Sequence, residues 1–164
     1  MNQIEKYFNA EKAESLLFII VGLLAMIIAI YFIVIIKTPF YKGFAYALIA
    51  IALLQLIVGT TVYFRSPKDI IKVNNIIEYN DHLKIKSEEI PRMQTVMKNF
   101  IIYRWIEIVL IIAGVISIFV FPTLQFWKGL GAGFALQGIL MLLLDLFAEN
   151  RGKVYLNYLQ SVVN

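Results

Sequence analysis

Four long runs of apolar residues dominate the chain. They cover about residues 15–36, 41–64, 100–121 and 126–148. Each run reaches the ~20 residues that a helix needs to cross ~30 Å of hydrocarbon. The pattern predicts an all-α polytopic membrane protein, in which residues 1–164 form a single domain with four transmembrane helices.

The breaks between the runs predict how the helices are connected. Lys37 and Pro39 end the first run, and the loop before Tyr41 is too short for anything but a helical hairpin. Pro122 breaks the chain before Lys128 opens the fourth run. We therefore expect two antiparallel hairpins.

A polar segment, residues 65–99, connects the two predicted hairpins and is too short to fold as an independent domain. Ser66 and Pro67 have the pattern of an N-cap and a first-turn proline, so a new helix should begin there. A second start is expected at Ser87, giving a helix from about residue 88 to 121. This cytoplasmic connection is predicted to be helical and to project from the membrane. Residues 79–82 are expected to form a polar turn in which His82 is a solvated loop residue.

Helical patterns also continue beyond the apolar runs at both ends of the chain. Ile4, Tyr7 and Phe8 suggest an amphipathic piece before the first run, and Tyr155 and Leu159 continue the pattern after the fourth. We expect the bundle to protrude on the side that holds both termini.

Composition supports the membrane assignment and excludes several kinds of site. Hydrophobic residues make up 60% of the chain and charged residues 16%, and the mean hydropathy is +0.77, more than a soluble domain of this size can bury. The absence of cysteine excludes disulfides and thiolate metal sites, and a single histidine excludes a bis-histidine haem. We predict no cofactor.

The distribution of charge orients the predicted helices. All eleven acidic residues lie on the side that holds both termini and the middle segment. Twelve of the fifteen basic residues lie there too: Lys6, Lys12, Arg65, Lys68, Lys72, Lys84, Lys86, Arg92, Lys98, Arg104, Arg151 and Lys153. The positive-inside rule therefore makes this side cytoplasmic and predicts a cell membrane, either plasma or inner. Acidic residues interrupt the basic ones, so nucleic-acid binding is not expected.

Six ionisable residues are predicted to converge near the inner boundary of the membrane, where each needs a partner. Helical spacing in the fourth run places Asp145 and Glu149 on one stripe with Gly131, Ala135 and Gly138. The whole candidate set is Glu14, Arg104, Glu107, Asp145, Glu149 and Arg151. Six other acids are expected to be solvated: Glu5, Asp69, Glu78, Asp81, Glu88 and Glu89.

Two interpretations of this charge cluster are open. In the first, Arg104 and Arg151 neutralise the acids in a structural ion-pair network, with Arg104 able to pair with Glu107 one turn away. In the second, the carboxylates form a pocket for a cation, a lipid headgroup or a cationic ligand, or two of them share a proton. The identity of a metal is not predicted. Gln55 and Gln137, deeper in the membrane, are expected to bond each other across helices.

Three functions fit these residues. The first is a non-catalytic binding, scaffolding or regulatory component with a protein partner on its cytoplasmic helices, because no catalytic constellation is complete. The second is a small oligomeric channel or transporter. The third is a lipid-active enzyme that uses the inner-face carboxylates, with Arg104 and Arg151 holding a phosphate. Membrane lipid is an expected partner in each case, and self-association is compatible with all three.

Overall fold

The computed structural model describes residues 3–79 and 82–163, and these ranges are helical with no strand. Helix α1 (Gln3–Tyr31) continues into a π-helical stretch, η1 (Phe32–Ile36), and is followed by α2 (Pro39–Glu78). The short α3 (His82–Lys84) and a second π-helical stretch, η2 (Ile85–Glu89), lead into α4 (Ile90–Val120), and α5 (Gln125–Val163) follows.

Four helical segments are long and apolar enough to cross a membrane: Gln3–Ile36, Pro39–Glu78, His82–Val120 and Gln125–Val163. The chain is therefore an all-helical protein with four candidate membrane spans. At ~1.5 Å per residue, the 40 residues of α2 extend over ~60 Å, about twice the hydrocarbon thickness. A substantial part of each long helix lies beyond its apolar run.

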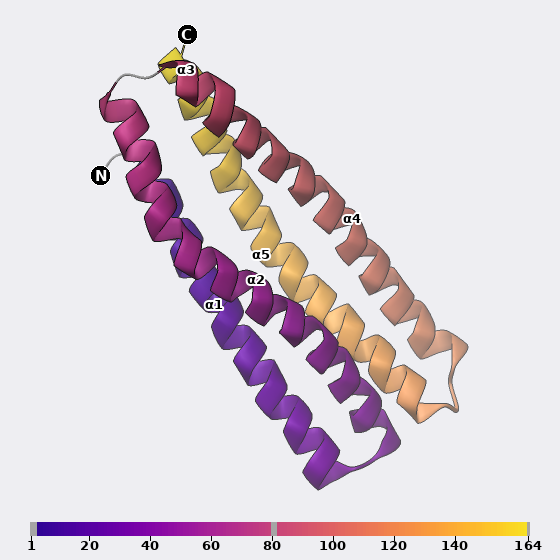
Figure 1. Ribbon diagram of the computed structural model, residues 1–164. Helices are drawn as coiled ribbons and strands as arrows, with labels where there is room; N and C mark the ends of the chain where they lie inside the picture. The colour runs from indigo at the N-terminus through magenta and orange to yellow at the C-terminus, as the bar shows by residue number, and fades with distance from the viewer. Residues whose placement is uncertain (1–2, 80–81, 164) are drawn as a thin grey trace.

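The long helices pack in the order α1, α2, α5, α4 (Figure 1). Helix α2 packs against both α1 and α5, and α5 packs against both α2 and α4. Contact between α1 and α5 is slight, and among the described helices α4 packs extensively only on α5. The two termini lie at the same end of the molecule as α3.

Glycines on one face of α5 bring it close to α2. A Cβ atom added at Gly129 would overlap the backbone carbonyl oxygen of Phe40, and one added at Gly133 would lie 2.6 Å from the Cβ of Ala47. Helices that lack side chains at such positions can approach with their backbones nearly in contact. The Gly129–Gly133 pair thus serves packing within the chain.

A second glycine face of α5 contacts α4. A Cβ atom on Gly114 of α4 would lie 2.5 Å from the carbonyl oxygen of Gly131, and one on Gly138 would lie 2.8 Å from the Ile111 side chain. As residue numbers rise along α5 they fall along α4, so these helices are antiparallel. The small-residue stripe predicted for the fourth run faces a neighbouring helix at Gly131 and Gly138.

The larger buried apolar cluster of the described residues lies at the end that holds the termini, beyond the apolar runs. We call it the extension core. Every long helix contributes to it, and its members are Ile4, Tyr7, Phe8, Val73, Ile76, Ile85, Met93, Tyr155 and Leu159. The Tyr155 ring stacks on Tyr7 with centroids 4.3 Å apart and meets the Phe8 ring edge-on at 5.7 Å. The ends of the helices are thus packed together as a rigid unit.

The helix start predicted at Ser66 is wrong, because α2 runs without a break through Pro67. Instead of capping a new helix, the Ser66 hydroxyl donates a hydrogen bond to the Glu11 carboxylate at 2.8 Å and lies 3.0 Å from the Val62 carbonyl oxygen. An internal proline costs a helix ~3 kcal/mol. Packing of α1 against α2 on both sides of Pro67 offsets that cost.

The start predicted at Ser87 is also wrong, since helical structure begins at His82 and Ser87 lies inside η2. Ile85, two residues before Ser87, is 1% exposed in the extension core. Its burial stabilises helical structure ahead of Ser87. His82 is exposed, as predicted for a residue of a polar turn. The residues before it in that predicted turn, Asn80 and Asp81, lie outside the described residues.

Candidate functional site

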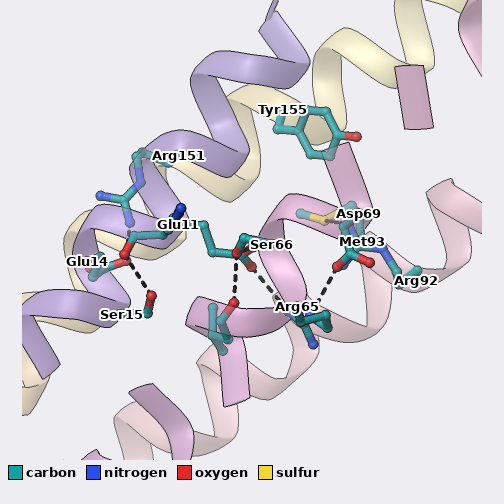
Figure 2. Close-up of polar contacts among 12 residues, drawn as sticks. Glu11, Glu14, Ser15, Arg65, Ser66, Asp69, Arg92, Met93, Arg151 and Tyr155 are labelled. Atoms are coloured by element: carbon teal, nitrogen blue, oxygen red, sulfur yellow. Dashed lines mark hydrogen bonds and ion pairs between the residues drawn. The ribbon is translucent and has the colours of Figure 1, made fainter. Parts of the chain in front are cut away.

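The six ionisable residues predicted to converge come from α1, α4 and α5, and the structure divides them into three groups. The first group joins α5 to α1: the Arg151 guanidinium donates to the Glu14 carboxylate (Figure 2). The Glu14 side chain is 14% exposed. A carboxylate this deeply covered is stable as an ion because a cation lies against it.

The second group joins α4 to α5 at Glu149, whose side chain is 7% exposed. Glu149 binds Arg104 of α4 and, at 2.8 Å, Lys153 one turn along its own helix. The expectation that Arg104 would pair with Glu107 is therefore wrong. A long cationic side chain in an apolar helix is directed toward the polar end of that helix, and Glu149 lies in that direction.

The third group consists of two carboxyls with no ion pair. Glu107 of α4 is 3% exposed, and neither of its carboxylate oxygens has a hydrogen-bond donor among the described residues. The Asp145 carboxyl of α5 lies within hydrogen-bonding reach of it. A hydrogen bond between two carboxyls requires a proton on one of them, since two carboxylates are both acceptors.

A further ion-pair group, between α1 and α2, was not predicted as a unit. Arg65 binds Glu11 at 3.3 Å and Asp69 at 3.0 Å, and Ser66 also donates to Glu11. Nearby, the Lys12 ammonium lies 4.9 Å from the centre of the Tyr63 ring. The i,i+4 spacing of Arg65 and Asp69 is visible in the sequence, whereas the contact with Glu11 depends on the packing of α1.

The extension core contains a polar group that the sequence interpretation treated as solvated. Glu89 is 4% exposed and accepts two hydrogen bonds from Arg92, at 2.6 and 2.8 Å, and one from the Tyr155 hydroxyl at 3.0 Å. Burial raises the pKa of the Tyr155 hydroxyl well above its ordinary value, and the Glu89 carboxylate raises it further. Tyr155 therefore stays protonated and acts as a donor.

The predicted contact between Gln55 and Gln137 is present. The Gln55 Nε2 atom donates to the Gln137 Oε1 atom at 3.3 Å, and both residues are at most 2% exposed. This bond joins α2 to α5 in the region of the glycine contacts. It is a cross-helix link of the kind that stabilises packing between membrane helices.

The interpretation of the charge cluster as a cation pocket finds no support in the geometry for a metal ion. Within residues 3–79 and 82–163 there is no group of three His, Cys, Asp or Glu side chains placed to hold a metal ion. Ca²⁺ takes six to eight oxygen ligands, so two carboxyls alone would be a poor site for it.

Comparison with known proteins leaves this arrangement without a match. No protein-family model matches the chain, and neither a curated protein nor a solved structure is similar to it.

Proposed function

We propose that the chain is a non-catalytic membrane protein that acts as a scaffold or regulatory component by binding a protein partner through its helical extension. The extension core carries this proposal. Its side chains are buried by other residues of the chain, and not by lipid. Four of them have no exposed surface: Ile4, Phe8, Met93 and Leu159. A surface held rigid in this way is pre-organised for binding, which lowers the entropy cost of association.

The proposed topology is two antiparallel transmembrane hairpins with both termini and residues 65–99 in the cytoplasm of a cell membrane. The distribution of basic residues supports it, because Lys37, Lys42 and Lys128 are the only basic residues of the full sequence near the other end. Anionic lipid at the inner face would attract the lysines of the extension.

Membrane lipid is the proposed partner of the outer face of α4. Trp105, Val109 and Ile112 are each more than half exposed there. A second copy of the chain could cover the same face in a homo-oligomer. The ion pairs Arg151–Glu14 and Arg104–Glu149 would fix the register of α5 against α1 and α4, as in the structural interpretation of the charge cluster.

The two other functions have less support. A channel needs polar groups along its path, but Gln55 and Gln137 are buried against each other. A lipid-active enzyme would need Arg104 and Arg151 to hold a phosphate, but both guanidiniums bind carboxylates of the chain.

Photo-cross-linking in cells tests the proposal. A benzophenone amino acid at Leu83, which is 80% exposed on the extension, should give one discrete protein adduct. Tyr79→Asp, at a neighbouring position that is 82% exposed, should remove the adduct and leave thermal stability unchanged. The matched control carries the probe at Phe119, 77% exposed at the other end of α4, and should give lipid adducts. Ion flux through proteoliposomes, with no protein adduct at Leu83, would favour a channel instead.

A further inference from the structure

Glu107 lies deep in the predicted membrane span. It is fourteen residues from Phe121, at the far end of α4, which corresponds to ~21 Å of helix at ~1.5 Å per residue. In a hydrocarbon layer of ~30 Å it is therefore inside the layer. An isolated charge at the centre of a membrane helix costs ~2.5–3.5 kcal/mol even on the most lenient scales.

The basic groups near Glu107 are bound to other carboxylates. Arg104, one turn away on α4, binds Glu149, and Lys153 of α5 binds the same carboxylate. Glu14 of α1 is near enough to Asp145 for the two charges to interact, and the Glu14 carboxylate is bound by Arg151. Among the described residues, Asp145 is thus the titratable group that faces Glu107 from the neighbouring helix.

We propose that Glu107 and Asp145 share a single proton and form a proton-binding site inside the membrane. One proton converts two adjacent acceptors into a hydrogen-bonded pair, and it halves the negative charge held there. Two carboxylates in contact in a low-dielectric site do not both ionise, because their repulsion and desolvation add. The proton supplies the donor that the buried Glu107 oxygens otherwise lack.

A proton fits this place better than a metal ion does. The Glu107 backbone is close to α5, since a Cβ atom on Gly138 would lie 3.4 Å from its carbonyl oxygen. Helices this close leave little room for an ion with its own coordination shell, and the described residues offer no third acidic or histidine ligand. A proton needs two oxygens and no additional volume.

The shared proton gives the protein a way to sense pH. As the pH rises and the proton leaves, two charges face each other across the contact between α4 and α5. Because α4 packs extensively on α5 alone among the described helices, this contact determines the position of α4. Proton release should loosen α4, and proton uptake should restore it.

Infrared spectroscopy of the full chain in lipid vesicles tests this proposal. Near neutral pH the protein should show the stretching band of one protonated carboxyl per chain, and the band should disappear at alkaline pH. The double variant Glu107→Gln with Asp145→Asn should lose the band. Glu149→Gln should keep it, because the Glu149 carboxylate is neutralised by Arg104 and Lys153.

Isotope labels make the test independent of whether the variants fold. In the unsubstituted protein, ¹³C in the side-chain carboxyls of either glutamate or aspartate should shift part of the band, since the proton is shared by one of each. The absence of a protonated-carboxyl band near neutral pH would overturn the proposal. A band that persists in the folded double variant, or that responds to one label only, would also overturn it.

Discussion

Gly129→Ala is expected to destabilise the protein by about 1–3 kcal/mol, the usual cost of forcing extra volume into a packed contact. The new methyl group would overlap the carbonyl oxygen of Phe40, which is backbone and cannot rotate away. Helices α2 and α5 would have to separate along their glycine contact. The expected loss is net of the ~1 kcal/mol by which alanine is favoured over glycine in a helix, so the overlap itself costs more.

Gly152→Ala is the matched control, because it is the same substitution in the same helix. A Cβ atom there would lie 2.9 Å from the Met97 sulfur, which is near the end of a flexible side chain and can move. Gly152→Ala should therefore be neutral or slightly stabilising. Both variants are compared by reversible unfolding in mixed detergent micelles, and equal shifts of the midpoint would contradict the α2–α5 contact described here.

Phe8→Ala is expected to have a larger effect, about 3–5 kcal/mol, which is typical for deleting a buried aromatic side chain. Phe8 has no exposed surface and packs against Tyr7 and Tyr155 in the extension core. Its loss would leave a cavity where three helices meet. Limited trypsin digestion should then cut the lysine-rich part of α2 beyond residue 65, and the same part should resist cleavage in the unsubstituted chain.

Phe64→Ala provides the comparison for Phe8→Ala. Phe64 is 71% exposed at the end of an apolar run, so lipid or detergent contacts it in the folded and unfolded states alike. Its replacement should change the unfolding free energy by less than ~0.5 kcal/mol, as is usual for surface sites. If the two variants lost the same stability, the extension would not be a packed unit, and the proposed binding surface would lose its support.

Much of the fold could be predicted from the sequence because lipid imposes strong constraints. A helix needs ~20 apolar residues to cross a bilayer, so the four candidate spans follow from the length and composition of the apolar runs. The positions of Gly131 and Gly138 on one stripe follow from helical periodicity, and the structure places both against α4. The bond between Gln55 and Gln137 was predictable because buried amides in lipid need partners.

Local signals failed where tertiary packing decides the outcome. Ser66 and Pro67 resemble a helix start, but contacts with α1 carry α2 through them. Glu89 lies in a polar segment and was expected to be solvated, yet Tyr155, distant in the sequence, buries it. Spacing within a single helix contains no information about such a partner.

The candidate site was predicted as a set of residues but not as a set of pairs. Helical periodicity predicted that Glu14, Glu107, Asp145 and Glu149 lie at similar depth in the membrane. Which acid each arginine binds depends on the reach of its side chain and the offset between helices, and neither is encoded in periodicity. Arg104 reaches past Glu107 to Glu149, and this separates the carboxyl pair from the ion pairs.

The most direct test of this division is the unfolding free energy of three variants that carry the same substitution: Glu14→Gln, Glu149→Gln and Glu107→Gln. The first two variants leave a partly buried arginine without its carboxylate. Each should lower the unfolding free energy by more than ~1 kcal/mol, because removing one partner of a fully buried ion pair costs ~3–5 kcal/mol. Glu107→Gln should be neutral or stabilising near neutral pH, because the amide can donate to Asp145 as the shared proton does. Equal losses in all three variants would contradict the account, since Glu107 would then belong to the same ion-pair network as Glu14 and Glu149.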